Sequence, residues 1–432
     1  MSAARRSDEG LRTYEVHQRM RLDESTALVK PRHLSSQQFL DDPYPILAVL
    51  RENYPCYRDW PGNAYWITRY DDVTSVFVDD ANFESRPKRW WYARLDWGRD
   101  AGAELAVLRC RAERLDACAE KVAERLVEQL RERVVREGRV DLATEFAARL
   151  PIELLAHVLD LPDDEVDTFA ERYWRMQRGV GFEPGAEHGG RVAMDDLCAY
   201  FEPLLAARRK QPGQDLVSIF GSLIFADGSS ASAADLVVTL LEDDHETLHG
   251  SLANLWFRLL TDLTQLGAVE EDGRMLKAAY LETLRHSPPV LSAKRFARHE
   301  VERFGRLLPE GAMVVCSAAA ANRDPRVFSD PDTFTIVRND LCQREPRGHY
   351  RADGLPSGIA FGVGPPSKYP AVPEDRPRSR YAITRDIAVG ASRALLGSRL
   401  GLRLAPDTQP RLRSLRLGEM HTCWSLPVVA ER

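Results

Sequence analysis

A run of ionisable side chains interrupts a long apolar segment near the middle of the chain. The apolar letters LVVTLL and LHGSLANLWFRLL flank this run. A carboxyl group beside a hydroxyl can pass a proton to a reacting group, which is the work of a general acid or base. Burying carboxylates is costly unless cations meet them, so such a run is unusual inside an apolar segment. Its members are Asp243, Asp244, His245, Glu246 and Thr247.

The same run contains the pattern H-E-x-x-H, from His245 to His249. Two histidines four residues apart share one face of a helix and can bind zinc, with the intervening Glu as a base. A zinc hydrolase needs a third ligand, and the candidates Glu270 and Glu271 follow the helix end expected at Gly267. We expect no metal here, because five-letter motifs of this kind also arise by chance.

A second charged pair, Glu282 and Arg285, lies in the segment YLETLRHSPP. Residues three apart on a helix face the same side and can pair. Taken alone, this spacing is typical of a solvated surface pair. The segment ANRDPRVFSDPDTFTIVR follows downstream and ends in a further cation, Arg338.

The elements that position these residues are mainly helical. Residues 111–137 form an amphipathic pattern that Gly138 should end, and residues 140–162 predict two helices broken at a proline, Pro151. The pair Ser232 and Asp235 predicts a capping box.

That capping box should open a long helix that ends near Gly267. Strands are few: residues 64–70 alternate like a strand, and residues 312–317 form the clearest one. Residues 1–35 predict an N-terminal arm, and residues 36–432 one large, mainly helical domain.

Composition excludes several classes of protein. The chain has 432 residues, 44% of them hydrophobic and 29% charged, which is ordinary for a globular protein. The net charge is −6 with no basic stripe, so we expect no nucleic-acid partner. No apolar run reaches the roughly 18 residues of a membrane span, and the N-terminus has no apolar signal region. Seven cysteines without a C-x-x-C pair predict reduced thiols in the cytoplasm.

Taken together, these segments resemble the cytochrome P-450 family. In that family a Glu and an Arg of one helix hold an Arg of the following meander, and Glu282, Arg285 and Arg338 match those positions. The segments DPYPILAVLRENYP, VDLATEFAARLP and RFARHEVERFGRLLPEGAMVV, and the final helix, match in order. The resemblance runs from about residue 36 to the end, and implies a mainly α fold with small β-sheets.

The haem-binding loop departs from the family's pattern, F-G-x-G-x-H-x-C-x-G. The chain has FGVGPPSKYP at residues 361–370. Counted forward, the cysteine position holds Lys368; counted back from the following helix, it holds Arg378. No cysteine occurs between Cys342 and Cys423. Because a Cys thiolate is the family's axial iron ligand, the resemblance implies the family's scaffold with the haem-binding cysteine absent and no cofactor.

Other haem contacts of the family are altered as well. The family places a His before a Leu-Arg pair; Leu108 and Arg109 match, but the His position falls on Leu105 or Glu104. Arg295 matches a propionate-binding Arg, and we expect it to form a structural salt bridge instead.

The long helix of the family carries A-G-x-[D/E]-T, in which the small residues lie against haem and oxygen. Here Asp243 and Asp244 replace those small residues, while Glu246 and Thr247 keep the acid–alcohol pair. The aspartates would project bulk and charge where dioxygen should lie. We therefore expect a degenerate pocket that is polar, collapsed or filled.

The missing ligand resembles one branch of the family, the haem-free homologues of antibiotic-producing actinobacteria. These accompany glycosyltransferases that attach deoxysugars, often aminosugars, to macrolide or anthracycline aglycones. The resemblance, at the level of fold, implies a non-catalytic protein that binds and activates a partner glycosyltransferase. Candidate contact surfaces are the N-terminal arm, the helix at 111–137 and the proline-rich insertion at 365–380.

Two alternatives stay open. One is a cytochrome P-450 monooxygenase with an atypical haem site. The other is a haem-independent enzyme that uses the remodelled pocket for a dehydration, a cyclisation or a metal-dependent step.

Overall fold

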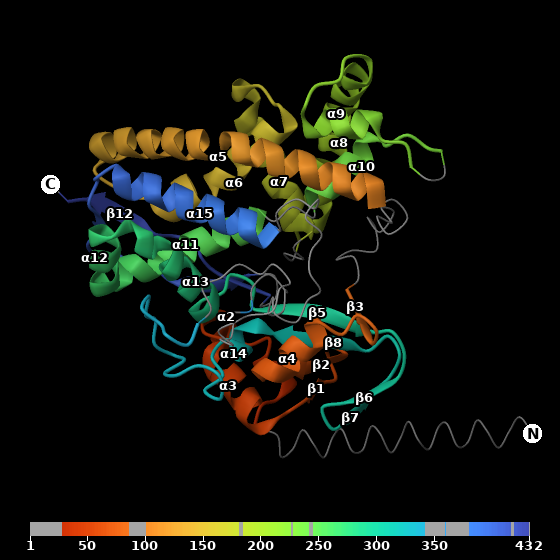
Figure 1. Cartoon of the computed structure of the whole chain (residues 1–432), viewed down its shortest axis with the longest axis vertical. Coiled ribbons are helices and arrows are strands. Elements are labelled where there is room, and N and C mark those ends of the chain that lie inside the picture. The colour runs from red at the N-terminus through yellow and green to blue at the C-terminus, as the bar shows by residue number, and fades with distance from the viewer. Residues whose placement is uncertain are drawn as a thin grey trace, which may run out of the picture.

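The computed structural model describes residues 28–85, 101–180, 185–225, 228–241, 245–341, 359, 380–415 and 419–431. The predictions made on Asp243, Asp244, Lys368 and Arg378 lie outside these residues, as does most of the proline-rich insertion. The fold is mainly helical with small sheets, which confirms the predicted fold class. Long helices form one part of the molecule, and the largest sheet with its short helices forms the other (Figure 1).

The helices carry most of the described chain. Their bounds are α2 Gln37–Asp41, α3 Tyr44–Asn53, α4 Tyr70–Phe77, α5 Ala101–Glu137, α6 Arg149–Leu159, α7 Val166–Val180, α8 Glu187–Lys210, α9 Leu216–Ser222, α10 Ala233–Leu241, α11 His245–Thr261, α12 Leu263–Glu271, α13 Leu276–His286, α14 Ala318–Ala321 and α15 Arg380–Gly397. Among the described residues, none of these helices is both long and apolar enough to cross a membrane.

The largest sheet has five strands in the order β1-β2-β8-β5-β3. Strands β2 and β8 run parallel, with Ala64 opposite Met313, and the other neighbouring strands pair antiparallel. The strands of the described chain are β1 Tyr57–Asp59, β2 Ala64–Ile67, β3 Phe83–Glu84, β4 Val140–Asp141, β5 Ser292–Ala297, β6 Val301–Arg303, β7 Arg306–Leu308, β8 Met313–Ser317, β9 Leu402–Leu404, β10 Leu412–Leu415, β11 Met420–Cys423 and β12 Pro427–Ala430.

Several predicted boundaries are confirmed. Helix α5 ends before Gly138, whose φ of 73° lets its N–H bond to the carbonyl of Val134 at 2.8 Å. The capping box is present, because the Ser232 N–H donates to the Asp235 carboxylate at 2.7 Å and the Asp235 N–H donates to the Ser232 hydroxyl at 3.3 Å. Strand β8 matches the predicted strand at 312–317.

Three predicted boundaries are wrong. Pro151 does not break a helix, because it lies in the first turn of α6, where no intrahelical N–H bond is lost. The predicted end at Gly267 falls inside α12, and the break lies at Asp262, whose carboxylate caps the N–H groups of Thr264 and Gln265. The predicted strand at 64–70 ends at Ile67, since α4 begins three residues later.

The main apolar core forms where α5, α6, α11, α13 and α15 meet (Figure 1). Trp256 of α11 is buried there, and its indole N–H donates to the Ser392 hydroxyl of α15 at 3.1 Å. A second core lies under α7, α8, α9 and α10, and a third packs the five-stranded sheet against α4 and α14. The last residues of the predicted arm, Val29 and Leu34, are buried against α3.

One glycine allows a close approach inside the main core. A Cβ added to Gly250 of α11 would lie 2.6 Å from Pro289 Cβ and 2.8 Å from Thr422 Oγ1. We expect Gly250→Ala to lower the free energy of unfolding by about 1–3 kcal/mol, because overpacking outweighs the better helix propensity of alanine. Urea denaturation measures this free energy.

The matched control is Gly267→Ala in α12, where a Cβ meets nothing within 4 Å. This variant should be more stable than the parent by about 0.5–1 kcal/mol, since only helix propensity changes. Equal stabilisation by both substitutions would contradict the close packing at Gly250.

Candidate functional site

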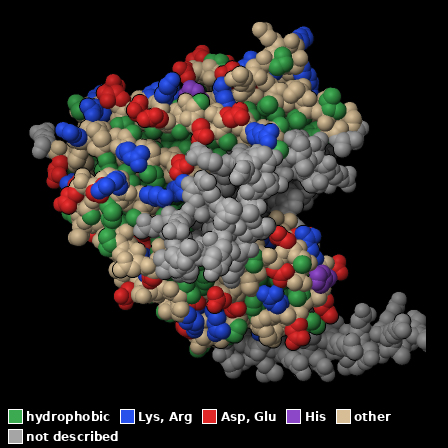
Figure 2. Space-filling view, in the orientation of Figure 1, with side chains coloured by type: hydrophobic (Ala, Val, Ile, Leu, Met, Phe, Trp, Pro, Cys, Tyr) green, Lys and Arg blue, Asp and Glu red, His purple; other side chains and the backbone are tan. Residues whose placement is uncertain are grey.

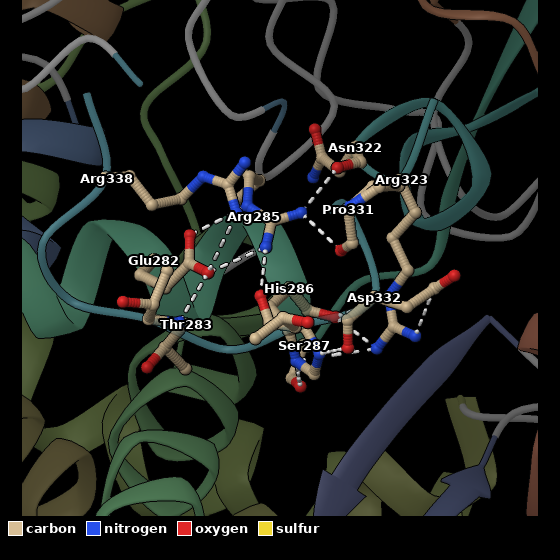
Figure 3. Close-up of polar contacts among 12 residues, drawn as sticks. Glu282, Thr283, Arg285, His286, Ser287, Asn322, Arg323, Pro331, Asp332 and Arg338 are labelled. Atoms are coloured by element: carbon tan, nitrogen blue, oxygen red, sulfur yellow. Dashed lines mark hydrogen bonds and ion pairs between the residues drawn. The ribbon is translucent and has the colours of Figure 1, made fainter. Parts of the chain in front are cut away.

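The predicted pair Glu282 and Arg285 lies on α13 and is fully buried. The Arg285 Nη2 and Nε atoms lie 2.6 and 2.7 Å from the two carboxylate oxygens of Glu282, a bidentate pair (Figure 3). Arg338 joins more loosely, with Nη1 3.8 Å from Glu282 Oε1, and makes a shorter bond of 2.8 Å to Asp340. The structure therefore brings the three predicted residues together and excludes a solvated surface pair.

The remaining donors of Arg285 reach backbone carbonyls of the following segment. They bond to Asn322 at 3.0 Å, Pro331 at 2.7 Å and Thr333 at 3.1 Å (Figure 3). The hydrogen bonds of the Arg285 guanidinium group thus connect α13 to residues 322–333. Because its donors all point to protein oxygens, we assign the cluster a structural role.

Of the predicted pocket, His245, Glu246 and Thr247 are described, and they open α11. The His245 ring lies edge-on to Tyr173 and Trp174 of α7, with centroids 4.9 and 4.8 Å apart. Its Nδ1 lies 2.5 Å from the Tyr173 hydroxyl. The described part of this pocket is therefore filled by aromatic side chains of α7.

The second histidine of the H-E-x-x-H pattern, His249, is also buried among aromatic rings. Its ring centroid lies 6.0 Å from Trp174 and 4.9 Å from Trp424. Glu270, considered above as a third zinc ligand, pairs instead with Arg403 at 3.0 Å. The described residues contain no group of three His, Cys, Asp or Glu side chains that could hold a metal ion.

Burial gives His249 a measurable effect on the pH dependence of stability, since it lowers the pKa of the imidazole to about 4. The folded state thus binds fewer protons than the unfolded state, where the pKa is about 6.5. The neutral imidazole therefore contributes stability that is fully present above pH 6.5 and is lost as the pH falls through the folded pKa. We expect His249 to account for about 2 kcal/mol of the stability lost between pH 7 and pH 5.

Urea denaturation at both pH values checks this expectation. The variant His249→Leu should lose less stability on acidification than the parent. A matched control is His188→Leu, because His188 is exposed on α8. An identical pH dependence in the parent and His249→Leu would show that His249 is not held neutral by burial.

The described cysteines are thiols with raised pKa values. Burial raises the pKa of Cys316 and Cys423 to about 12, and the Cys423 thiol donates to the Ser425 carbonyl at 3.3 Å. A thiol with a raised pKa is protonated at neutral pH, and a metal that binds it must displace this proton. Burial raises the pKa of the other described cysteines as well, which are Cys56, Cys110, Cys118 and Cys198.

The residues that match the family's propionate contacts are placed in two different elements. Arg109 is exposed on α5. Arg295 lies on β5, with its guanidinium carbon 4.8 Å from the Phe77 ring centroid and Nη1 3.0 Å from the Lys294 carbonyl. The expected salt bridge of Arg295 stays a prediction.

Sequence reasoning missed the residues that follow β8. Asn322 donates to the carbonyls of Leu284 and Ile359. Arg323 donates to the carbonyl of His286 at 2.7 Å (Figure 3). Both are buried. The segment ANRDP is the sequence feature that could have indicated these two residues, but we predicted no role for any residue in it.

Comparisons with known proteins agree on the family. The family model for cytochrome P450 matches residues 273–365. Cytochrome P450 107B1 of Saccharopolyspora erythraea is 33% identical over 329 residues, covering 70% of this chain and 77% of the relative. The cytochrome P450 monooxygenase PikC of Streptomyces venezuelae is 30% identical over 359 residues, covering 76% and 81%. The chain belongs to the cytochrome P450 family.

Solved structures support the same fold. The ligand-free cytochrome P450 TbtJ1 has a TM-score of 0.74 at 22% identity, covering 92% of this chain and 100% of that one. CalO2 has a TM-score of 0.71 at 26% identity, covering 92% and 98%. Another relative, the 6-deoxyerythronolide B hydroxylase of Saccharopolyspora erythraea, is 28% identical over 80% of this chain and 77% of its own length. Relatives of this chain are thus named as monooxygenases and hydroxylases.

Proposed function

We propose that this chain keeps the cytochrome P450 scaffold without the thiolate-bound haem, and acts as a non-catalytic partner that activates a glycosyltransferase of antibiotic biosynthesis. One observation carries the first half of the proposal: no cysteine stands between Cys342 and Cys423. The raised pKa values of the described thiols support this half of the proposal, because a metal would have to displace a tightly held proton from any of them.

Binding alone can produce the proposed activation. A helper that binds the active form of a transferase more tightly than its inactive form shifts that equilibrium by its differential affinity. Such a helper needs a rigid scaffold, and the buried Glu282–Arg285 pair and the three apolar cores provide one. On the described part of the face seen in Figure 2, basic and acidic side chains are interspersed.

A second candidate is a cytochrome P450 monooxygenase with an atypical haem site. The specific observation in its favour is that PikC is named as a monooxygenase and matches 76% of this chain. Taken alone, the comparisons support this candidate better than the first. The residue types at 361–379 argue against it, since this segment contains no cysteine or histidine.

The absorption spectrum of the full chain, expressed with ample haem precursor, separates the two candidates. We expect no haem absorbance in the purified protein, and no band at about 450 nm after reduction under carbon monoxide, because the thiolate responsible for that band is missing. Cytochrome P450 107B1, expressed and purified in parallel, is the positive control. Stoichiometric haem in our chain would overturn the proposal and support the monooxygenase.

Co-expression tests the second half of the proposal. A glycosyltransferase encoded beside this chain should gain activity or solubility when the two are produced together, and the pair should co-purify. Full transferase activity without this chain would overturn the helper role, whatever the spectrum shows.

A further inference from the structure

A cavity of about 890 Å³, lined by both apolar and polar side chains, lies apart from the degenerate pocket, between elements that are distant in the sequence. Residues of α2 and α3 form one wall, and Arg258 near the end of α11 lies on another. Arg323, after α14, and His421, on β11, also line it. A volume of this size is typical of small-molecule sites.

Arg258 is one of the cations that line this cavity. Its side chain is half-buried, and Nε donates to the Ser287 hydroxyl at 2.8 Å. Within the described ranges, no carboxylate lies within ion-pair distance of it and its two terminal nitrogens have no hydrogen-bond partner. Burial is the main cause that lowers the pKa of Arg258; Tyr44 and Asp42 act to raise it, and the positive charge of Arg323 acts to lower it. A guanidinium still carries its charge at neutral pH, so Arg258 presents free donors and a positive charge to the cavity.

Arg323 adds a second positive charge to the same cavity. Its guanidinium carbon lies 3.4 Å from the centroid of the Tyr44 ring, and Nη1 pairs with Asp332 at 3.1 Å. Figure 3 shows this pair beside His286 and Ser287 at the end of α13. The pKa of His421 is lowered to about 4, mainly by burial; the Asp41 carbonyl and the Asp42 charge act to raise it, and Arg258 and Arg323 act to lower it. The cavity thus brings basic groups close to one another and to Asp42.

The rim carries two further cations, Arg411 and Arg413, both exposed. The lining contains four arginines against three aspartates, Asp41, Asp42 and Asp332. Asp332 is paired with one of those arginines. Asp41 accepts a bond from Gln37 at 2.8 Å, and Asp42 accepts one from the Tyr44 N–H at 3.2 Å. The carboxylates are thus partly engaged, whereas the arginines of α11 and the rim have no carboxylate partner within the described ranges.

We propose that this cavity binds a small organic anion through a phosphate or carboxylate group held by Arg258 and the rim arginines. Arginine forks suit both groups, because each offers two oxygens to parallel N–H donors. The cavity is much larger than a single phosphate, so the rest of the ligand lies against Tyr44, Phe257 and Leu412, which also line it. This site is independent of the haem question and of the glycosyltransferase.

Isothermal titration calorimetry of the full chain tests the proposal with two probes in separate arms, inorganic pyrophosphate and citrate. The parent should bind at least one of them with a dissociation constant in the millimolar range or below, and the probe that binds identifies the group. Arg258→Gln should weaken that binding about tenfold or more, since it removes a charge-assisted hydrogen bond. Arg413→Gln should also weaken it, and should leave folding intact because this residue is exposed.

The matched control is Arg191→Gln, on the exposed surface of α8, which should bind like the parent. Circular dichroism checks that each variant is folded. Two results would overturn the proposal: no binding of either probe by the parent, or equal binding by the parent and by the folded Arg258→Gln and Arg413→Gln variants.

Discussion

Replacing Arg285 by methionine is expected to lower the free energy of unfolding by about 5 kcal/mol, the largest effect that we predict for one substitution. The reason is the complete burial of its ion pair with Glu282. Methionine would leave that carboxylate uncompensated inside the protein, and it would remove the donors to the carbonyls of Asn322, Pro331 and Thr333. Removing one partner of a buried pair costs far more than the pair itself contributes.

Urea denaturation followed by circular dichroism measures the effect. The matched control is Arg175→Met, because Arg175 pairs with Glu171 on α7 while both side chains are exposed, by 48% and 70%. We expect the control to lose less than about 1 kcal/mol. The double variant Glu282→Gln with Arg285→Met should recover part of the loss, since the buried charge is gone. A similar loss in Arg285→Met and Arg175→Met would show that burial does not set the cost.

The second large effect is expected at Asn254, a fully buried amide in the middle of α11. Its Nδ2 donates to the carbonyls of Ser287 and His421 at 2.9 and 3.0 Å. Its Oδ1 accepts the Cys423 N–H at 2.9 Å. Asn254→Leu keeps the branched shape of the side chain but leaves three buried backbone groups without this partner, so we expect a loss of about 4 kcal/mol.

The same denaturation experiment checks this expectation, with Asn53→Leu as the control. Asn53 is exposed at the end of α3 and donates to the Val49 carbonyl within its own helix. The control should change stability by less than about 0.5 kcal/mol. A loss below about 1 kcal/mol for Asn254→Leu would mean that water or a local shift satisfies the three backbone groups.

These two residues connect segments that are far apart in the sequence. Arg285 connects α13 to the segment that follows α14, and Asn254 connects α11 to β11 and to the residue after α13. Both bond networks consist of protein groups. The proposed function requires such contacts, because a chain without a haem ligand keeps the family's fold only through its internal contacts.

The sequence by itself determined the features that depend on near neighbours. Spacing and side-chain type predicted the end of α5 at Gly138, the capping box at Ser232 and the pairing of Glu282 with Arg285. The absence of a cysteine between Cys342 and Cys423 is likewise read directly from the letters. Boundaries at Pro151 and Gly267 were wrong, since a proline is harmless in a first turn and a glycine is tolerated inside a packed helix.

Only the tertiary structure decided which charges are buried and which side chains meet. Sequence spacing put Glu282 and Arg285 on one helix face, but the fold around α13 buried them. His245 packs against α7, about seventy residues earlier in the chain. The cavity of Arg258 and Arg323 gathers residues from Gln37 to His421. A local pattern reaches three or four residues along a helix, whereas burial and convergent charge depend on contacts between segments far apart in the chain.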